Sequence, residues 1–75
     1  MADKKLDARG LTCPLPVLKA IKAIKELSPG GTLEVLATDP GAVPDFEALC
    51  QRGRHTLLES SEQQGVYRFL IQKSA

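Results

Sequence analysis

The chain has 75 residues, a net charge of +1, and a composition of 43% hydrophobic and 25% charged residues. This length suits one domain, close to the lower size at which a hydrophobic core is stable without disulfides or metals. The composition excludes disorder of the whole chain. No apolar run is long enough to cross a bilayer, and the polar N-terminal residues contain no signal-peptide core. Two cysteines, Cys13 and Cys50, do not make a disulfide framework. We therefore expect residues 1–75 to form a single domain in the reducing cytoplasm.

The first half of the chain predicts a strand, a helix and a second strand. Apolar and polar residues alternate around Leu6–Ala8, which predicts a short strand ended by Gly10. Apolar residues then recur at helical spacing, which predicts a helix from about Pro14 to Leu27. A proline and two glycines end this helix, and a strand is expected over Thr32–Thr38.

The second half predicts a helix and two more strands. After an Asp-Pro-Gly turn, a helix is expected over Val43–Gln51, with Phe46, Leu49 and Cys50 facing inward. Two strands should then form a hairpin: Leu57–Ser60 and Tyr67–Ile71, joined by a Ser61–Gly65 loop. The order β-α-β-α-β-β predicts an α/β (α+β) fold. It should be a two-layer sandwich in which a four-stranded mixed sheet carries both helices on one face.

Cys13 lies between Gly10-Leu11-Thr12 and Pro14-Leu15-Pro16, and this pattern predicts a thiol at a helix start. The first turn of a helix tolerates proline because its N–H groups have no internal partner, and Pro14 suits the first helical position. We expect Cys13 to be the N-cap, where its side chain could accept from the Leu15 N–H. The helix dipole would then favour the thiolate. A merely structural N-cap is the alternative, but cysteine caps helices poorly.

The remaining residues offer few partners for enzymatic chemistry. Cys50 falls on an apolar stripe, where a free cysteine behaves as a small hydrophobe. His55 is the only histidine, and no metal site is expected because the spacing of His55 and the cysteines matches no ligand pattern. No phosphate loop and no Cys-x-x-Cys pair is present, and no cofactor is expected. A lone thiol of this kind suits a covalent carrier whose partners supply the chemistry, with Cys13 attacking a partner's persulfide.

Basic residues concentrate at the start of the chain. Residues 1–25 contain six basic and two acidic residues, whereas residues 26–75 contain four basic and seven acidic ones. Lys19 and Lys22 should lie on the exposed face of the first helix, where they could attract an acidic protein partner. A simple solvated helix face is the alternative. Nucleic acid is a weaker hypothesis, because the basic patch is small and only three aromatic residues are available for stacking.

Three segments together resemble the TusA/SirA family of small sulfur-carrier proteins. They are Asp7-Ala8-Arg9-Gly10-Leu11-Thr12-Cys13-Pro14-Leu15-Pro16, the Asp39-Pro40 pair, and Tyr67-Arg68-Phe69-Leu70-Ile71. The Gly-Leu-x-Cys-Pro-x-Pro segment is the specific element, and the resemblance spans nearly the whole chain. The ending Tyr67–Ile71 is most similar to the TusA branch.

The resemblance implies a cytoplasmic persulfide carrier, hence a sulfurtransferase, with its carrier cysteine at Cys13 and its motif residues at Gly10, Pro14 and Pro16. It implies a cysteine desulfurase or a rhodanese as sulfur donor and a DsrE-type sulfurtransferase as acceptor. The sulfur would go toward 2-thiouridine in tRNA or into sulfur oxidation. We expect a monomer that forms transient complexes, without direct contact to membranes or nucleic acid. The alternative is a noncatalytic regulatory or RNA-binding module built on a similar small fold.

Overall fold

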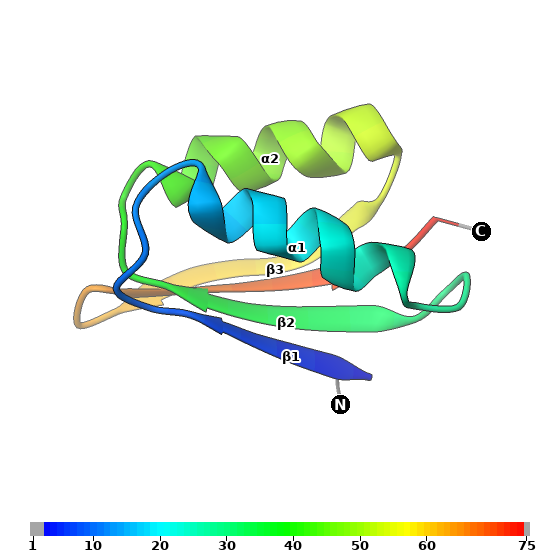
Figure 1. Ribbon diagram of the computed structural model, residues 1–75, viewed down its shortest axis with the longest axis horizontal. Coiled ribbons are helices and arrows are strands. Elements are labelled where there is room, and N and C mark those ends of the chain that lie inside the picture. The colour runs from blue at the N-terminus through cyan, green and yellow to red at the C-terminus, as the bar shows by residue number, and fades with distance from the viewer. Residues whose placement is uncertain (1–2, 75) are drawn as a thin grey trace.

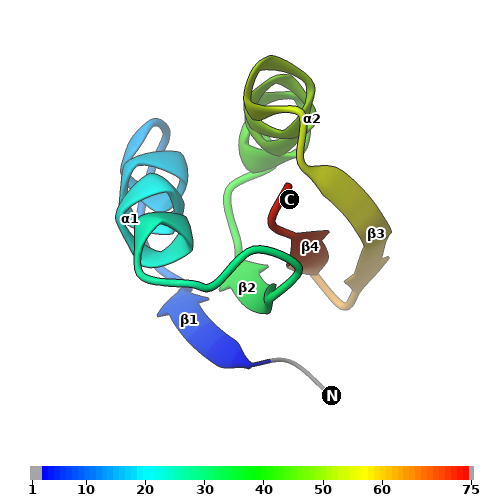
Figure 2. The same ribbon diagram turned by 90° about the vertical axis from the view of Figure 1, so that its right-hand side faces the viewer.

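Four strands form one sheet, and two helices cover one of its faces, as the computed structural model of the protein shows (Figures 1 and 2). The structure describes residues 3–74. Its elements are β1 (Lys4–Ala8), α1 (Leu15–Lys25), β2 (Thr32–Ala37), α2 (Ala42–Gly53), β3 (Thr56–Gln63) and β4 (Val66–Gln72). This architecture confirms the predicted two-layer sandwich. Within the described residues, no helix is long and apolar enough to span a membrane.

The sheet is mixed and has the strand order β1-β2-β4-β3. β1 pairs in parallel with β2, with Leu6 opposite Val35 and Ala8 opposite Ala37, whereas β4 runs antiparallel to both of its neighbours. Because parallel strands end at the same edge of a sheet, the segments that follow β1 and β2 leave from neighbouring positions. The two helices consequently begin side by side at one end of the molecule (Figure 1).

The core lies between the sheet and the two helices. The sheet contributes buried residues from its two central strands and Ala8 from β1, while the helical residues of the core include Ala20, Ile24, Phe46 and Cys50. The rings of Phe46 on α2 and Phe69 on β4 stack with centroids 4.5 Å apart, and both are fully buried. This contact fixes α2 over the middle of the sheet. Of the residues expected to face inward on α2, Phe46 and Cys50 are buried, whereas Leu49 is half-buried.

The hairpin differs from its prediction. β3 runs to Gln63 instead of ending at Ser60, so the expected Ser61–Gly65 loop shrinks to the two residues Gln64 and Gly65. Both have positive φ, 53° and 82°, which matches the tight turn whose twist suits a two-residue hairpin. The end of β3 is exposed and polar, so it carries no hydrophobic alternation. Backbone pairing with β4 holds it in the sheet.

The end of α1 differs slightly from the prediction as well. The helix ends at Lys25 instead of Leu27, because the Glu26 and Leu27 N–H groups donate to the carbonyls of Ala23 and Ile24, at 3.1 and 3.0 Å. These bonds span three residues and tighten the last turn. Leu27 still packs into the core from this turn, so the apolar stripe extends beyond the helix itself.

The stacked ring of Phe46 should be a main source of stability. Phe46→Ala removes a fully buried ring and leaves a cavity against Phe69, so we expect the free energy of unfolding to fall by about 3–5 kcal/mol. Leu58→Ala is the control, because Leu58 is 49% exposed, and it should change the free energy by no more than about 0.5 kcal/mol. Urea unfolding measures both. Equal effects of the two changes would contradict the assigned core.

Candidate functional site

Gly10 turns the chain from the end of β1 toward the helical layer. Its φ is +82°, which glycine adopts without strain, and its N–H donates to Thr38 Oγ1 at 2.9 Å. The Leu11 N–H closes the turn on the Ala8 carbonyl at 3.3 Å. These bonds tie the segment that carries Cys13 to the end of β2. The position of Gly10 in the motif therefore has a structural reason.

Asp39 holds the backbone of Cys13 in place. One carboxylate oxygen, Oδ2, accepts the Cys13 N–H at 2.6 Å, and the other, Oδ1, accepts the Gly41 N–H at 3.1 Å. These two hydrogen bonds to the charged form lower the pKa of Asp39 below its ordinary value. An ionised carboxylate thus links the loop after β1 to the loop after β2, with Cys13 at the junction.

The start of α1 corrects the expected N-cap. The helix begins at Leu15 with Pro14 as its N-cap, so Cys13 lies one residue further out, before a cis Cys13–Pro14 peptide bond. The Leu15 N–H donates to the Thr12 carbonyl at 2.9 Å and is not available to the Cys13 side chain. The turn that begins at Thr12 therefore satisfies the Leu15 N–H, which we expected the Cys13 side chain to satisfy. The Cys13 side chain is free to point elsewhere.

The Cys13 thiol is exposed and donates a hydrogen bond to Oδ2 of Asp45 in the first turn of α2. This bond is the main reason that the pKa of Cys13 lies above the ordinary value of a thiol. Partial desolvation and the negative charges of Asp45 and Asp39 act in the same direction. The expected preference for the thiolate is therefore wrong for the isolated protein. Two acidic side chains next to the sulfur outweigh the helix start behind it.

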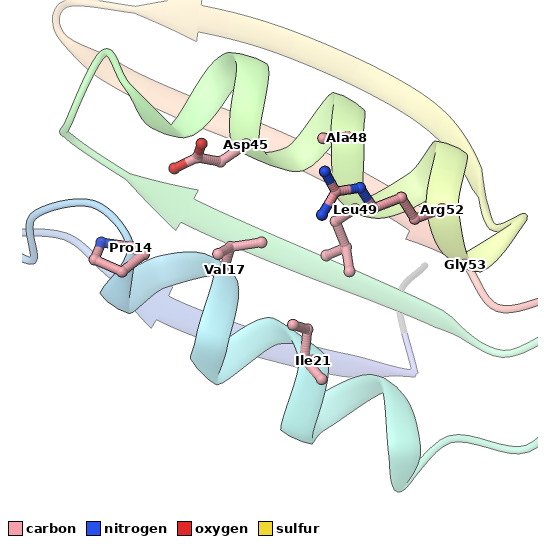
Figure 3. Close-up of a pocket in the computed structure, with 8 residues that line it drawn as sticks. All are labelled: Pro14, Val17, Ile21, Asp45, Ala48, Leu49, Arg52 and Gly53. Atoms are coloured by element: carbon pink, nitrogen blue, oxygen red, sulfur yellow. The ribbon is translucent and has the colours of Figure 1, made fainter.

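A groove with a volume of about 520 Å³ runs between α1 and α2 and ends close to Cys13. Pro14 and Asp45 lie at one end, Arg52 and Gly53 lie at the other, and Val17, Ile21 and Leu49 point into the space between (Figure 3). The half-buried Val17 and Ile21 belong to the apolar stripe predicted for the first helix, so part of that stripe lines the groove instead of the core. The Cys13 thiol thus lies at the mouth of a mostly apolar groove.

The two motif prolines have different environments. Pro14 is exposed and lines the groove beside Cys13, whereas the Pro16 ring is fully buried beneath the first turn of α1. The buried Pro16 contributes packing, so a change at this position affects stability as well as the thiol. Nothing in the sequence pattern separates these two roles.

The predicted basic pair lies apart from the groove. Lys19 and Lys22 are exposed and line a second, smaller depression that includes Lys4 and Lys5 of β1. Both predicted lysines therefore face the β1 side of α1 and form a mainly basic surface with two lysines from the strand, of which Lys4 forms an ion pair with Glu26. The structure does not bring them into contact with Cys13.

Cys50 occupies the buried position that we expected for it, and His55 lies in the connection after α2. Cys50 is 4% exposed within the core, and desolvation raises the pKa of its thiol. His55 Nδ1 accepts the Ser74 N–H at 3.0 Å, which fastens the last described residue to the end of α2. Across residues 3–74, no group of three or more His, Cys, Asp or Glu side chains gathers in a way that could hold a metal ion.

Known proteins resemble this chain over almost its entire length. A family model described as Sulfurtransferase TusA matches residues 4–73. A sulfur carrier protein TusA of Allochromatium vinosum is 50% identical over 72 residues, which cover 96% of this chain and 95% of that protein. A putative sulfur carrier protein of Bacillus subtilis is 47% identical, with coverage of 96% of each chain.

A solved structure agrees with these relatives. The SirA-like protein from Desulfitobacterium hafniense superimposes with a TM-score of 0.85 at 28% identity, over 96% of this chain and 99% of that one. The chain therefore belongs to the TusA sulfurtransferase family, and its fold is that of a SirA-like protein. The sulfur-carrier resemblance seen in the sequence is confirmed at this level.

Sequence reasoning missed the roles of Asp39 and Asp45. In the sequence, Asp39 marks a turn and belongs to the Asp-Pro pair of the family resemblance, and Asp45 is one residue of the second predicted helix. The signal that could have found them is topological. In a β-α-β unit with parallel strands, the residues that follow both strands meet at one edge. Acidic residues just after the second strand should therefore lie near a cysteine that follows the first strand.

The link through Asp39 predicts a pH-dependent contribution to stability. Because the pKa of Asp39 is lower in the folded than in the unfolded chain, its stabilisation is complete above the unfolded value of about 3.9 and is lost as the pH falls through the folded value. Asp39→Asn should therefore be less stable than the parent at neutral pH, with a gap that narrows in acid. Urea unfolding over a pH series measures it, with Glu47→Gln as a carboxyl control. A gap that stays constant while the carboxyl titrates would contradict this role.

Proposed function

We propose that the protein is a sulfur carrier of the cytoplasm that holds a sulfane sulfur as a persulfide on Cys13. The observation that carries the proposal is the exposed Cys13 thiol on a loop held by Asp39 at the mouth of the interhelical groove. Membership of the TusA family and the names of its relatives support the same function. Cys50 is buried, so a single thiol is presented to partners.

The transfer needs no cofactor, because sulfur moves by displacement at sulfur. The Cys13 Sγ attacks the outer sulfur of a donor persulfide, a new S–S bond forms, and the S–S bond of the donor breaks to release its thiol. The thiol proton of Cys13 is lost as the bond forms, and a proton is taken up by the leaving sulfur, so the exchange is balanced. A thiol of the acceptor then attacks the outer sulfur on Cys13 in the same manner.

The surface around Cys13 suits brief contacts with other proteins. Leu15 and Leu18 on α1 are 45% and 53% exposed, although both are large apolar side chains. They lie shortly after the cysteine in the chain and offer apolar contact to a partner that approaches it. We propose a cysteine desulfurase or a rhodanese as donor and a DsrE-type sulfurtransferase as acceptor, with a monomeric carrier between them. The sulfur would go toward tRNA thiolation or into sulfur oxidation.

Sulfur loading should depend on Cys13 and not on Cys50. Cys13→Ser should abolish the addition of sulfur when the protein is incubated with a cysteine desulfurase and cysteine, as measured by mass spectrometry of the intact protein. Cys50→Ala is the matched control, and it should retain loading because the Cys50 thiol is buried in the core. A folded Cys50→Ala protein that no longer loads would contradict the single-site model. Loading of neither the parent nor the control would favour a noncatalytic regulatory or RNA-binding module.

The basic surface formed by Lys4, Lys5, Lys19 and Lys22 should accelerate encounters with acidic partners. Lys19→Glu with Lys22→Glu should slow sulfur transfer with at least one cognate partner at low salt, and the difference should shrink as salt increases. Stopped-flow transfer over an ionic-strength series measures this. Alkylation of Cys13 by neutral iodoacetamide is the control and should change little, because these lysines do not contact the thiol. Unchanged transfer with every partner would reduce this surface to a solvated helix face.

A further inference from the structure

The charges that act on the Cys13 thiol are both negative. Asp45 reaches it from the first turn of α2 and accepts its hydrogen bond, while Asp39 acts from the loop between β2 and α2. Asp39 is occupied by two backbone N–H groups and maintains the shape of the loop. Asp45 contacts the sulfur itself and lines the open groove, so its carboxylate can be reached from outside. The two acids therefore differ in what they touch.

The basic residues near this region are placed elsewhere in the described part of the chain. Arg9 pairs with Asp7, with Nε 2.9 Å from Oδ1. Arg52 follows Asp45 by seven residues on the same helix, which corresponds to about 10 Å along the axis. Its side chain points back along the groove (Figure 3), but it forms no ion pair with Asp45 in the described part of the chain. Lys19 and Lys22 line the second depression. Because no basic side chain of the described residues forms an ion pair with Asp45, its carboxylate is open to a cation from another molecule.

We propose that Asp45 is a positioning residue that keeps Cys13 as a protonated thiol in the free carrier, and that a sulfur-transfer partner activates Cys13 by placing a basic side chain against the Asp45 carboxylate. The hydrogen bond from Sγ to Oδ2 stabilises the thiol over the thiolate. A lysine or arginine that pairs with Asp45 removes this acceptor and adds a positive charge beside the sulfur. Both effects favour the thiolate, which is the nucleophile in sulfur exchange.

This inference rests on the proposed carrier function, and it specifies the kind of partner surface that the site accepts. The partner should present a basic side chain within contact distance of its own reacting sulfur. An acidic group at that place would meet two carboxylates and be repelled. Proteins that lack the basic group would find a protonated and therefore less reactive thiol. Asp45 thus couples recognition to reactivity without a conformational change in the carrier.

Thiol–disulfide exchange with small charged probes tests the idea without a protein partner. Cystamine carries two ammonium groups, whereas bis(2-hydroxyethyl) disulfide is neutral and dithiodiglycolate is anionic. In each reaction, Cys13 attacks one sulfur, forms a mixed disulfide and releases one thiol. The rate ratio of the cationic to the neutral probe should be about fivefold higher for the parent than for Asp45→Asn at low salt. Comparing the two proteins cancels the intrinsic difference between the probes, and the anionic probe should show the opposite trend.

The pH profile of iodoacetamide alkylation gives a second readout that a merely structural role would not move. Asp45→Asn should shift the midpoint for Cys13 downward by about one pH unit, and alkylation at neutral pH should become up to about tenfold faster. Asp45→Glu keeps the charge and should return both readouts toward the parent. Glu47→Gln removes the same charge from an exposed position of the same helix and should leave both unchanged. Peptide mass spectrometry assigns each reaction to Cys13 and not to Cys50.

The outcomes separate this inference from the carrier function. Asp45→Asn that matches Glu47→Gln in both the probe ratio and the alkylation midpoint would overturn the role of Asp45, even if the parent still loads sulfur. Failure of the parent to load sulfur would overturn the carrier function, whatever the probes show. Circular dichroism of each variant confirms the fold, and Asp45→Ser, which also removes the charge, provides the test if Asp45→Asn does not fold.

Discussion

The parallel pairing of β1 with β2 is the constraint on which the site depends. It requires a crossover through α1 and places the ends of both strands at one edge of the sheet, so the segments that follow them meet there. Cys13 follows the first strand, and Asp39 and Asp45 follow the second. The site therefore combines two segments that are distant in sequence, since Asp39 and Asp45 follow Cys13 by 26 and 32 residues. The antiparallel strands β3 and β4 complete the sheet, and their hairpin reaches the same end, with Tyr67 opposite Ala37, but neither strand contributes a hydrogen bond to Cys13.

Much of the fold could be predicted from local pattern, because each buried face has a clear period. The helices, the order of the elements and the two-layer arrangement all follow from apolar spacing and from the breaks at proline and glycine. The predicted hairpin loop is too long because the end of β3 is exposed. Backbone pairing with β4, not side-chain burial, decides where β3 ends. Cys13 could also be recognised, since its motif is contiguous. The environment of the Cys13 thiol could not be predicted from this motif, because Asp45 reaches the sulfur from a different helix.

The protonation of the Cys13 thiol differs from the expectation because the helix dipole and the acidic side chains act over different ranges. A helix dipole acts within the first turn, and Cys13 lies one residue outside the N-cap of α1. Asp45, by comparison, contacts the sulfur directly, and Asp39 adds a second negative charge nearby. Direct contact with a carboxylate is therefore the main cause of the raised pKa of the thiol. A helix start identifies where a reactive cysteine can be, but its neighbours across the groove determine its state.

A carrier has to satisfy two opposing requirements, since its sulfur must be accessible to partners and yet unreactive between encounters. This chain assigns the two requirements to different acids within one short segment. Asp39 uses both carboxylate oxygens on backbone N–H groups, so it fixes where Cys13 is presented. Asp45 has its oxygen on the thiol and faces the open groove, so it governs how readily the sulfur reacts. Because one contact is to backbone and the other to sulfur, a partner can disturb the second without dismantling the first.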